Sequence, residues 1–347
     1  MSSPDRVRVR FPGISSRAYE HPADRSALVA LRTLSGFDTA LKVLAGAFRE
    51  RSLRLVYLAS AVRVGPTQFT EVHAMVQDAG KILDLYELPE VFVVQEPTIN
   101  AFTLGIDRPW IVVTTGALEL FDDAELRFVL GHECGHVLSG HAVYRTMLHQ
   151  LMSLAARVAW VPVGGWGLRA VVFALEEWQR AAEFSGDRAG LLVGQDVDAA
   201  LRAHMKTAGG SRLRDMDAGA FLAQAQDYAN TTQARDSIAK ILNLMGRSHP
   251  FAVQRAGDLR DWVVSGDYNR ILGGEYPSRV DDGDASMREE VAATLRSYRA
   301  KADGSSDPLL KLLRDVSGGM TDVAGDVADR LRGRFGRSGG GGGPAAE

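Results

Sequence analysis

The chain has 347 residues, which is enough to bury a sizeable core in one large domain or two smaller ones. Its hydrophobic content of 46% and charged content of 24% are typical of a soluble globular protein, and its net charge of −3 argues against a nucleic-acid partner. The single cysteine, Cys134, excludes an internal disulfide framework. The first 11 residues carry charges throughout and contain no apolar signal segment, so we expect a cytoplasmic protein.

Residues 1–60 are predicted to form an N-terminal extension that contains helices. At its start, residues 6–11 alternate basic and apolar side chains, which favours a short edge strand with Val7, Val9 and Phe11 on one face. Apolar spacing predicts helices at residues 23–34, 38–48 and, beyond the extension, 68–83.

Short β-prone segments follow. Residues 91–94 and 110–115 are rich in β-branched and aromatic side chains and are bounded by proline or glycine, which predicts two strands. Residues 100–105, between them, are a candidate third strand. Because these segments come immediately before a long helix, we expect an α+β, mostly helical fold with a small sheet beside that helix.

The long helix carries Gly-His-Glu-Cys-Gly-His at residues 131–136, which contains the pattern H-E-x-x-H. Asp122 can cap its first turn, and Glu125 lies three residues later, as in a capping box. Apolar residues recur at helical spacing and predict a buried face, while Gly140 marks the predicted end of the helix.

His132 and His136 are four residues apart and therefore lie on one face of this helix, about one turn from each other. Two neutral imidazoles so placed can bind one zinc ion. Glu133 then projects beside the metal, where it can take a proton from a metal-activated water. The alternative interpretation is a chance pattern on a structural helix, so the assignment depends on a third ligand.

The rest of the chain is predicted to be mainly helical. Residues 147–175 contain an uncharged run, 158–168, that is too short to span a bilayer; we expect a buried helical hairpin turning at 162–167, or a hairpin that touches a membrane or a partner. Further helices are predicted at 171–193, 197–207, 218–228, 234–245 and 251–264, with a loop at 266–279. The predicted domains beyond the extension are a metallopeptidase domain at 61–280, C-terminal helical segments at 281–337 and a disordered glycine-rich tail at 338–347.

Zinc held by two histidines needs a third protein ligand and an open position. A histidine six residues after His136 would make a metzincin-type site, but that position is Ala142, and His141 is one residue out of register. Glu183 is the strongest candidate, because Asp187 lies one turn further along the same helix face and can accept a hydrogen bond from a ligand histidine. Candidates without such a supporting residue are Glu176, Glu177, His149 and His204.

These features resemble the HtpX and CAAX-prenyl-protease family of gluzincin metallopeptidases, from about residue 68 to residue 260. Asn100-Ala101-Phe102 with Gly105 resembles the N-A-F-x-x-G segment of that family. After the H-E-x-x-H and E-x-x-x-D elements, Ser248-His249-Pro250 with Arg255 resembles its [ST]-H-P-x-x-x-x-R segment. Motifs in this shared order imply a zincin (gluzincin) metalloprotease fold.

The resemblance also implies roles for single residues. His249 would donate a hydrogen bond to the oxyanion of the tetrahedral intermediate, and Arg255 would brace the site by pairing with a nearby carboxylate. Asn100, Ala101 and Phe102 would belong to an edge strand that pairs with an extended substrate, with Asn100 binding a substrate carbonyl.

The prediction is therefore a zinc-dependent endopeptidase with one Zn²⁺ per chain, protein or peptide substrates, and Glu133 as the general base. The alternative is a non-catalytic or latent zincin domain that acts as a binding or scaffold module. Membrane members of the family carry transmembrane helices before the catalytic domain, and often a pair between its two motifs. We expect no transmembrane span here, and residues 147–175 offer only a peripheral membrane contact.

Overall fold

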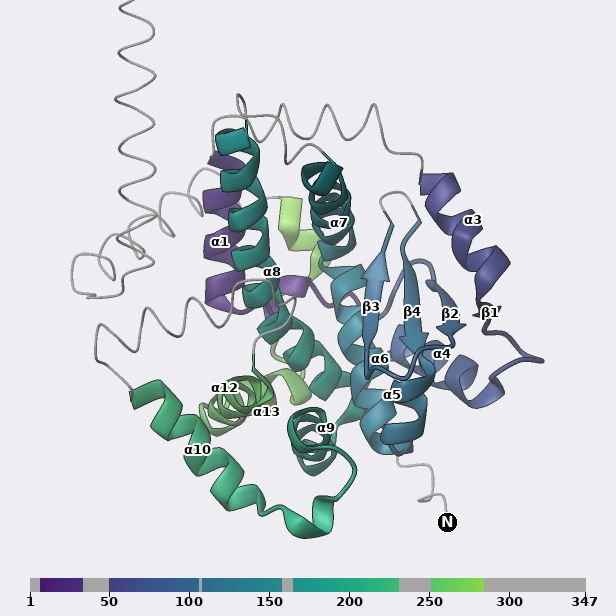
Figure 1. Ribbon diagram of the computed structural model, residues 1–347. Helices are drawn as coiled ribbons and strands as arrows, with labels where there is room; N and C mark the ends of the chain where they lie inside the picture. The colour runs from purple at the N-terminus through teal and green to yellow at the C-terminus, as the bar shows by residue number, and fades with distance from the viewer. Residues whose placement is uncertain (1–6, 34–49, 106–107, 158–164, 231–250, 284–347) are drawn as a thin grey trace, which may run out of the picture. The chain divides into compact units, whose positions relative to one another are not determined.

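The computed structural model describes residues 7–33, 50–105, 108–157, 165–230 and 251–283 (Figure 1). All of these belong to one compact unit, formed by Met1–Asn230 and Gly246–Leu295. A second unit, Thr231–Met245 and Arg296–Glu347, lies outside the described residues. The helices predicted at 38–48 and 234–245, the segments predicted beyond residue 283 and the tail also lie outside them.

Helices make up most of the described chain, as predicted. In chain order they are α1 (Pro22–Thr33), α3 (Glu50–Ser60), α4 (Thr70–Ile82), α5 (Thr115–Leu120), α6 (Asp123–Leu138), α7 (His141–Arg157), α8 (Gly165–Gly194), α9 (Val197–Gly209), α10 (Ala218–Asn230), α12 (Ala252–Val264) and α13 (Asp267–Leu272). Single 3-10 turns occur at Ser16–Ala18, Leu213–Asp215 and Arg279–Gly283. The prediction of a loop throughout 266–279 is wrong, because α13 forms there and buries Tyr268 and Ile271.

The sheet has four strands, β1 (Val62–Arg63), β2 (Glu90–Val94), β3 (Ala101–Leu104) and β4 (Trp110–Thr114), in the spatial order β1-β2-β4-β3. β2 and β4 are parallel, whereas β1 pairs antiparallel with β2 and β3 pairs antiparallel with β4. The three predicted strands are confirmed, and β3 is an edge strand. The two-residue strand β1 was not predicted.

Both faces of the sheet are covered, which explains why β2 and β4 are apolar without alternation. Ile111 and Val113 face the main core, which also contains residues of α4 and α6. Phe92 and Trp110 point to the opposite face, where the Tyr57 ring of α3 lies 6.1 Å from each of their ring centroids. The sheet is therefore a layer between α3 and the helical body (Figure 1).

Helix α6 begins and ends as predicted. The Asp122 side chain accepts from the Glu125 backbone N–H at 2.9 Å, and the Glu125 side chain accepts from the Asp122 N–H at 3.0 Å, which completes the capping box. Gly140, with φ 68°, follows the last turn. Cys134 is fully buried on this helix, and burial raises the pKa of its thiol to about 12, so it is a packing residue.

Helices α6 and α8 pack closely because glycines lie at their contact. A Cβ at Gly135 would lie 2.3 Å from the Cβ of Ala189, and a Cβ at Gly186 would lie 2.5 Å from the ring of His132. Both glycines lie inside the two sequence motifs. The close approach brings Glu183 of α8 up to the histidines of α6.

The strand predicted at residues 6–11 is wrong. The described part, 7–11, joins no sheet; instead, the Gln195 amide accepts from the Val9 N–H at 3.0 Å and donates to the Val9 carbonyl at 2.7 Å. A side chain thus satisfies the backbone groups that a neighbouring strand would have paired. Val7 is 94% exposed and Phe11 is 0% exposed, so the alternate residues do not share one face.

The N-terminal segment nevertheless belongs to the core. Phe11, Ile14 and Tyr19 are fully buried in the same cluster as residues of α4, α6 and α8. Contacts therefore cross the domain boundary predicted at residue 60, which itself stays a prediction.

Helices α7 and α8 pack against each other, as the predicted hairpin requires. Leu148 of α7 shares a buried cluster with Leu175 and Trp178 of α8. The connecting residues 158–164 lie outside the described chain. Among the helices that the structure describes, none is both long enough and apolar enough to cross a bilayer.

Candidate active site and metal centre

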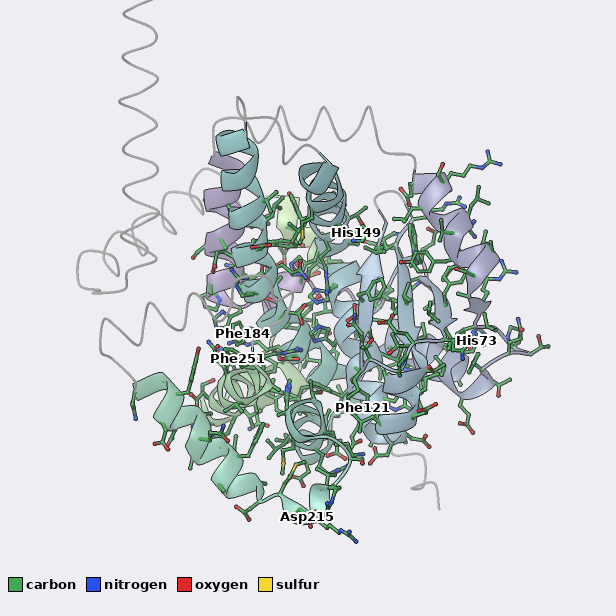
Figure 2. All side chains as sticks on the ribbon, viewed as in Figure 1. His73, Phe121, His149, Phe184, Asp215 and Phe251 are labelled. Atoms are coloured by element: carbon green, nitrogen blue, oxygen red, sulfur yellow. The ribbon has the colours of Figure 1, made fainter. Side chains whose placement is uncertain are left out.

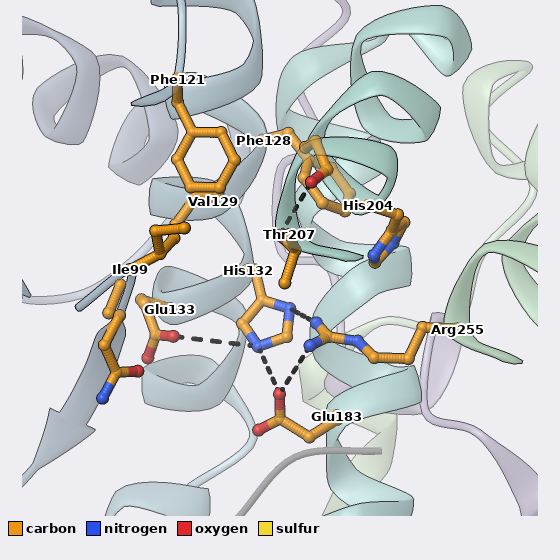
Figure 3. Close-up of a pocket in the computed structure, with 13 residues that line it drawn as sticks. Ile99, Phe121, Phe128, Val129, His132, Glu133, Glu183, His204, Thr207 and Arg255 are labelled. Carbon is orange, nitrogen blue, oxygen red and sulfur yellow. Dashed lines mark hydrogen bonds and ion pairs between the residues drawn. The ribbon is translucent and has the colours of Figure 1, made fainter. Parts of the chain in front are cut away.

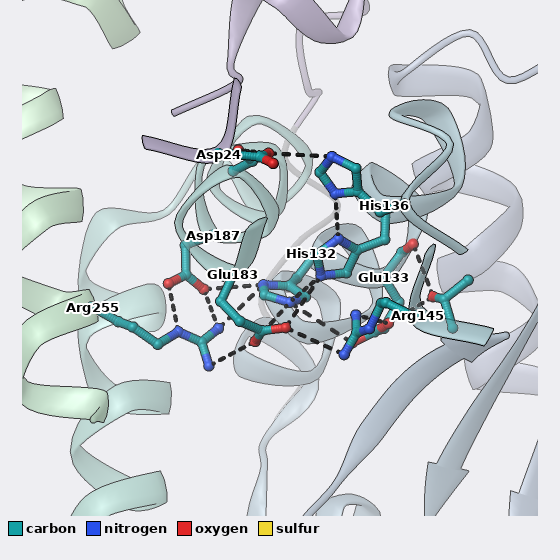
Figure 4. Close-up of polar contacts among 11 residues, drawn as sticks. Asp24, His132, Glu133, His136, Arg145, Glu183, Asp187 and Arg255 are labelled. Carbon is teal, nitrogen blue, oxygen red and sulfur yellow. Dashed lines mark hydrogen bonds and ion pairs between the residues drawn. The ribbon is translucent and has the colours of Figure 1, made fainter. Parts of the chain in front are cut away.

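The three predicted metal ligands come together in the interior, where α6 meets α8 (Figure 4). The Nε2 atoms of His132 and His136 are 3.0 Å apart. The Glu183 carboxylate approaches both rings, with one oxygen 3.5 Å from Nε2 of His132 and the other 3.5 Å from Nε2 of His136. All three side chains are buried.

The donor set fits zinc. Two imidazole nitrogens and one carboxylate converge from two helices, and their ligand atoms all lie within 4.8 Å of one another. Two histidines and one glutamate are the ligands of a common type of catalytic zinc site, which keeps a fourth position open. The carboxylate also compensates the charge of a buried cation, which an all-histidine set would not do.

Asp187 and Arg255 hold His132 from behind. Nδ1 of His132 lies 3.0 Å from Oδ1 of Asp187, an arrangement in which Nδ1–H donates and Nε2 faces the metal position. Arg255 donates two hydrogen bonds to the Asp187 carboxylate, at 2.5 and 2.7 Å, and its other nitrogen lies 3.2 Å from Glu183. Both residues therefore lie beside the ligands.

Two buried residues contact the carboxylate of Glu133. Oγ1 of Thr103, from β3, donates to it at 2.6 Å, and the guanidinium of Arg145, from α7, lies 3.6 Å away. The same guanidinium lies 3.2 Å from Glu183. Glu133 itself is 3.8 Å from Nε2 of His132, so its carboxylate lies next to the metal position without belonging to the ligand set.

The two ligand histidines have opposite pKa shifts. Burial lowers the pKa of His132, but hydrogen bonds to Asp187 and Glu183 outweigh burial and raise that pKa to about 9. For His136, burial and the positive charge of Arg145 hold the pKa well below its usual range.

The carboxyl of Asp187 stays ionised at neutral pH. Burial raises the pKa of its carboxyl, but the charge of Arg255 and the hydrogen bonds to His132 and Arg255 hold it far below the usual value. A permanent negative charge behind His132 makes that ring a better metal donor.

A cavity of about 120 Å³ opens beside His132 and Glu133 (Figure 3). Asn100 and Ala101 line it from the start of the edge strand. Phe102 does not line the cavity. It packs with Phe92 and Trp110 on the face of the sheet that points away from the main core. The apolar part of the wall comes from Ile99, Phe121, Phe128, Val129 and Ala203.

The weaker ligand candidates do not join the metal cluster of the described residues. His149 is exposed on α7 (Figure 2), Glu176 and Glu177 are only partly buried on α8, and His204 lines the cavity 3.6 Å from Asp187. His249 lies outside the described residues, and its role stays a prediction.

Sequence reasoning missed four polar residues at the site: Asp24, Thr103, His141 and Arg145. The sequence favours His141 as a helix-end or substrate-side histidine rather than a ligand, whereas in the structure Nδ1 of its ring lies 2.9 Å from Nδ1 of His136. Arg145 carried a usable signal, since a charge on the apolar side of a helix is rarely buried without a partner. Thr103 and Asp24 carried no signal, because their roles depend on which elements pack against α6 and α8.

The fold and the site together define a zinc metallopeptidase, with a histidine–histidine–glutamate triad typical of zinc peptidases. The profile of Peptidase family M48 matches residues 66–263, and the chain belongs to this family.

The similar proteins agree with this membership. Plastoglobule-localized metallopeptidase 48, chloroplastic, of Arabidopsis thaliana is 33% identical over 276 residues, which cover 76% of this chain and 77% of that protein. Protease HtpX homolog of Bacillus subtilis (strain 168) is 34% identical over 97 residues, 26% of this chain and 31% of its own length. Protease HtpX of Xanthomonas axonopodis pv. citri is 30% identical over 151 residues, 42% of this chain and 50% of its own length. No solved structure matches significantly.

Proposed function

We propose that this metallopeptidase is an endopeptidase that holds one zinc ion per chain through His132, His136 and Glu183. The observation that carries the proposal is the convergence of these three buried donors beside a carboxylate that is not a ligand, Glu133. When bound, zinc supplies a Lewis acid that polarises the scissile carbonyl and lowers the pKa of a coordinated water.

Glu133 acts as the general base in this proposal. Its carboxylate accepts the proton of the attacking water and then delivers it to the leaving amine. The hydrogen bond from Thr103 fixes the orientation of the carboxylate, and the guanidinium of Arg145 lies 3.6 Å from it. The general base, Glu133, and the metal ligand Glu183 are therefore both paired with the same cation, Arg145.

Two further roles rest on the resemblance to family motifs. His249 donates a hydrogen bond to the oxyanion of the tetrahedral intermediate. Arg255 positions His132 through Asp187, which its two hydrogen bonds to that carboxylate support.

The substrate is a peptide in extended conformation. β3 is an edge strand that leads directly to the site, so a substrate backbone can add to it as a further strand. Asn100 lies where that strand begins and lines the cavity, which supports a role in binding a substrate carbonyl. A cytoplasmic location and a peripheral membrane contact through residues 147–175 stay predictions, to be tested by cell fractionation.

The proposal is tested by digesting a peptide library with the purified protein, with Glu133→Gln and with chelator-treated protein. We expect one zinc per chain in the first two samples, and cleavage only in the first, with a loss of at least about 10³-fold in kcat for Glu133→Gln. Cleavage that survives in Glu133→Gln contradicts the mechanism. Bound zinc without cleavage of any peptide favours the scaffold alternative.

A further inference from the structure

A buried chain of hydrogen bonds runs from the N-terminal helix to the second zinc ligand. Nε2 of His141 lies 3.2 Å from Oδ2 of Asp24, and Nδ1 of His141 lies 2.9 Å from Nδ1 of His136 (Figure 4). We infer that Asp24 is a positioning residue for the metal centre, acting through His141 on His136. The inference rests on the proposed zinc coordination by His136.

The polarity of this chain follows from what each atom can do. A carboxylate only accepts, so Nε2 of His141 carries the proton that it shares with Asp24. For Nε2 of His136 to bind a metal, its Nδ1 has to carry the proton and donate to Nδ1 of His141, which then accepts. The remaining nitrogen of His136, Nε2, is left with its lone pair directed at His132 and Glu183, which is the form that binds a metal.

Asp24 is a buried, hydrogen-bonded residue rather than an acid at the protein surface. It is 1% exposed, and His141 is 2% exposed. Burial of a carboxylate is costly unless it is hydrogen-bonded, and the Ser185 hydroxyl donates to Asp24 at 2.6 Å. The rings of Trp178 and His141 are nearly perpendicular, with centroids 5.3 Å apart, and this contact restricts the rotation of the His141 ring.

The N-terminal segment also docks firmly on both metal-bearing helices. Tyr19 donates to the carbonyl of Gly135 at 3.0 Å, inside the H-E-x-x-H motif, and the His21 N–H donates to Ser185 at 2.8 Å, between Glu183 and Asp187. The two ligand histidines therefore have matching supports: Asp187 directly behind His132, and Asp24 through His141 behind His136.

The test measures zinc affinity in full-length protein by competition with a chromophoric chelator. We expect Asp24→Ala to raise the zinc dissociation constant about 10- to 100-fold, and Asp24→Asn to raise it less, because an amide oxygen can still accept from His141. The control is Asp258→Ala, which removes the contact of 3.0 Å between His21 and Asp258, together with the pair of 3.4 Å to Arg188, and so loosens the same segment without touching the relay. Its affinity should equal that of the wild type.

A wild-type affinity in Asp24→Ala, or an equal loss in Asp258→Ala, overturns the inference. A wild type that binds no zinc would instead contradict the proposed function. Because Asp24→Ala could fail to fold, a second measurement uses the zinc-bound wild type: long-range ¹H–¹⁵N NMR of the histidines. The expected tautomers are Nε2–H for His141 and Nδ1–H for His136, and Nδ1–H on His141 would refute the relay.

Discussion

Each ionisable side chain at the metal centre is paired with a group that sets its charge or orientation. Arg145 illustrates this, since it is 5% exposed and lies between Glu133 and Glu183. Two buried carboxylates so close to each other would repel strongly without a cation. Arg145 therefore maintains the site when zinc is absent.

We expect Arg145→Met to destabilise the metal-free protein by about 3–5 kcal/mol, because it leaves buried charges without their partner. Zinc should reduce that difference, since it brings positive charge to the same carboxylates. Urea unfolding with chelator and with zinc measures both values. Arg214→Met, which alters a surface pair with Asp215, is the control and should stay within about 0.5 kcal/mol. An equal cost with and without zinc would contradict this role.

The buried ring of His204 is expected to make the free energy of unfolding sensitive to acid. Burial lowers its pKa to about 4, against about 6.5 for an unfolded histidine, so the folded state binds fewer protons between these values. Stability is therefore lost as pH falls through this window. Between pH 7 and pH 5, metal-free wild type should lose about 2 kcal/mol more than His204→Gln. Parallel pH profiles for the two proteins in urea unfolding would show that His204 is not the cause.

At the scale of elements, the site depends on how closely α6 and α8 approach. The approach is set by glycines within the motifs, so Gly135→Ala should force the helices apart, because its Cβ would lie 2.3 Å from that of Ala189. We expect a cost of about 1–3 kcal/mol in urea unfolding, together with weaker zinc binding. The matched control is Gly194→Ala on α8, whose nearest neighbour would lie 3.9 Å away and which should be tolerated. If both variants show the same stability and zinc affinity, Gly135 is not required for the close approach of α6 and α8.

The helices and strands also show which elements could be predicted from the sequence. The caps of α6 and the β-branched strands are local signals, and both proved reliable. The apolar period of α6 predicted one buried face, but polar and apolar residues on all sides of this helix are buried. The wrong strand at residues 6–11 had a local pattern too, but Gln195 satisfies its backbone from a distant part of the chain. Local pattern fails where a partner far along the chain decides the outcome.

For the whole molecule, the N-terminal segment is part of the folded unit rather than an appendage. Phe11→Ala should therefore cost about 3–5 kcal/mol, a large share of the stability of an ordinary domain, because its ring is 0% exposed. Val7→Ala, at a side chain that is 94% exposed, should stay within about 0.5 kcal/mol. Urea midpoints compare the two, and a negligible effect of Phe11→Ala would mean that the segment is dispensable.

The residues of the zinc triad were predictable because each lies in a short sequence pattern with helical spacing. The spacing of His132 and His136 places two rings on one helix face, and the spacing of Glu183 and Asp187 does the same for a ligand and its support. Residue type and helical period were sufficient for these assignments. Arg255 was recognised through its motif, and the structure places it against Asp187.

Asp24, Thr103, His141 and Arg145 were not predictable as site residues. Asp24 lies more than 100 positions before His136, and Thr103 is an ordinary strand residue in sequence. Their roles arise because α1, β3 and α7 pack around α6 and α8 and deliver polar groups into a space where water is excluded. Sequence spacing identifies which residues can bind the metal, whereas packing determines the hydrogen bonds and charges that hold those residues in their binding form.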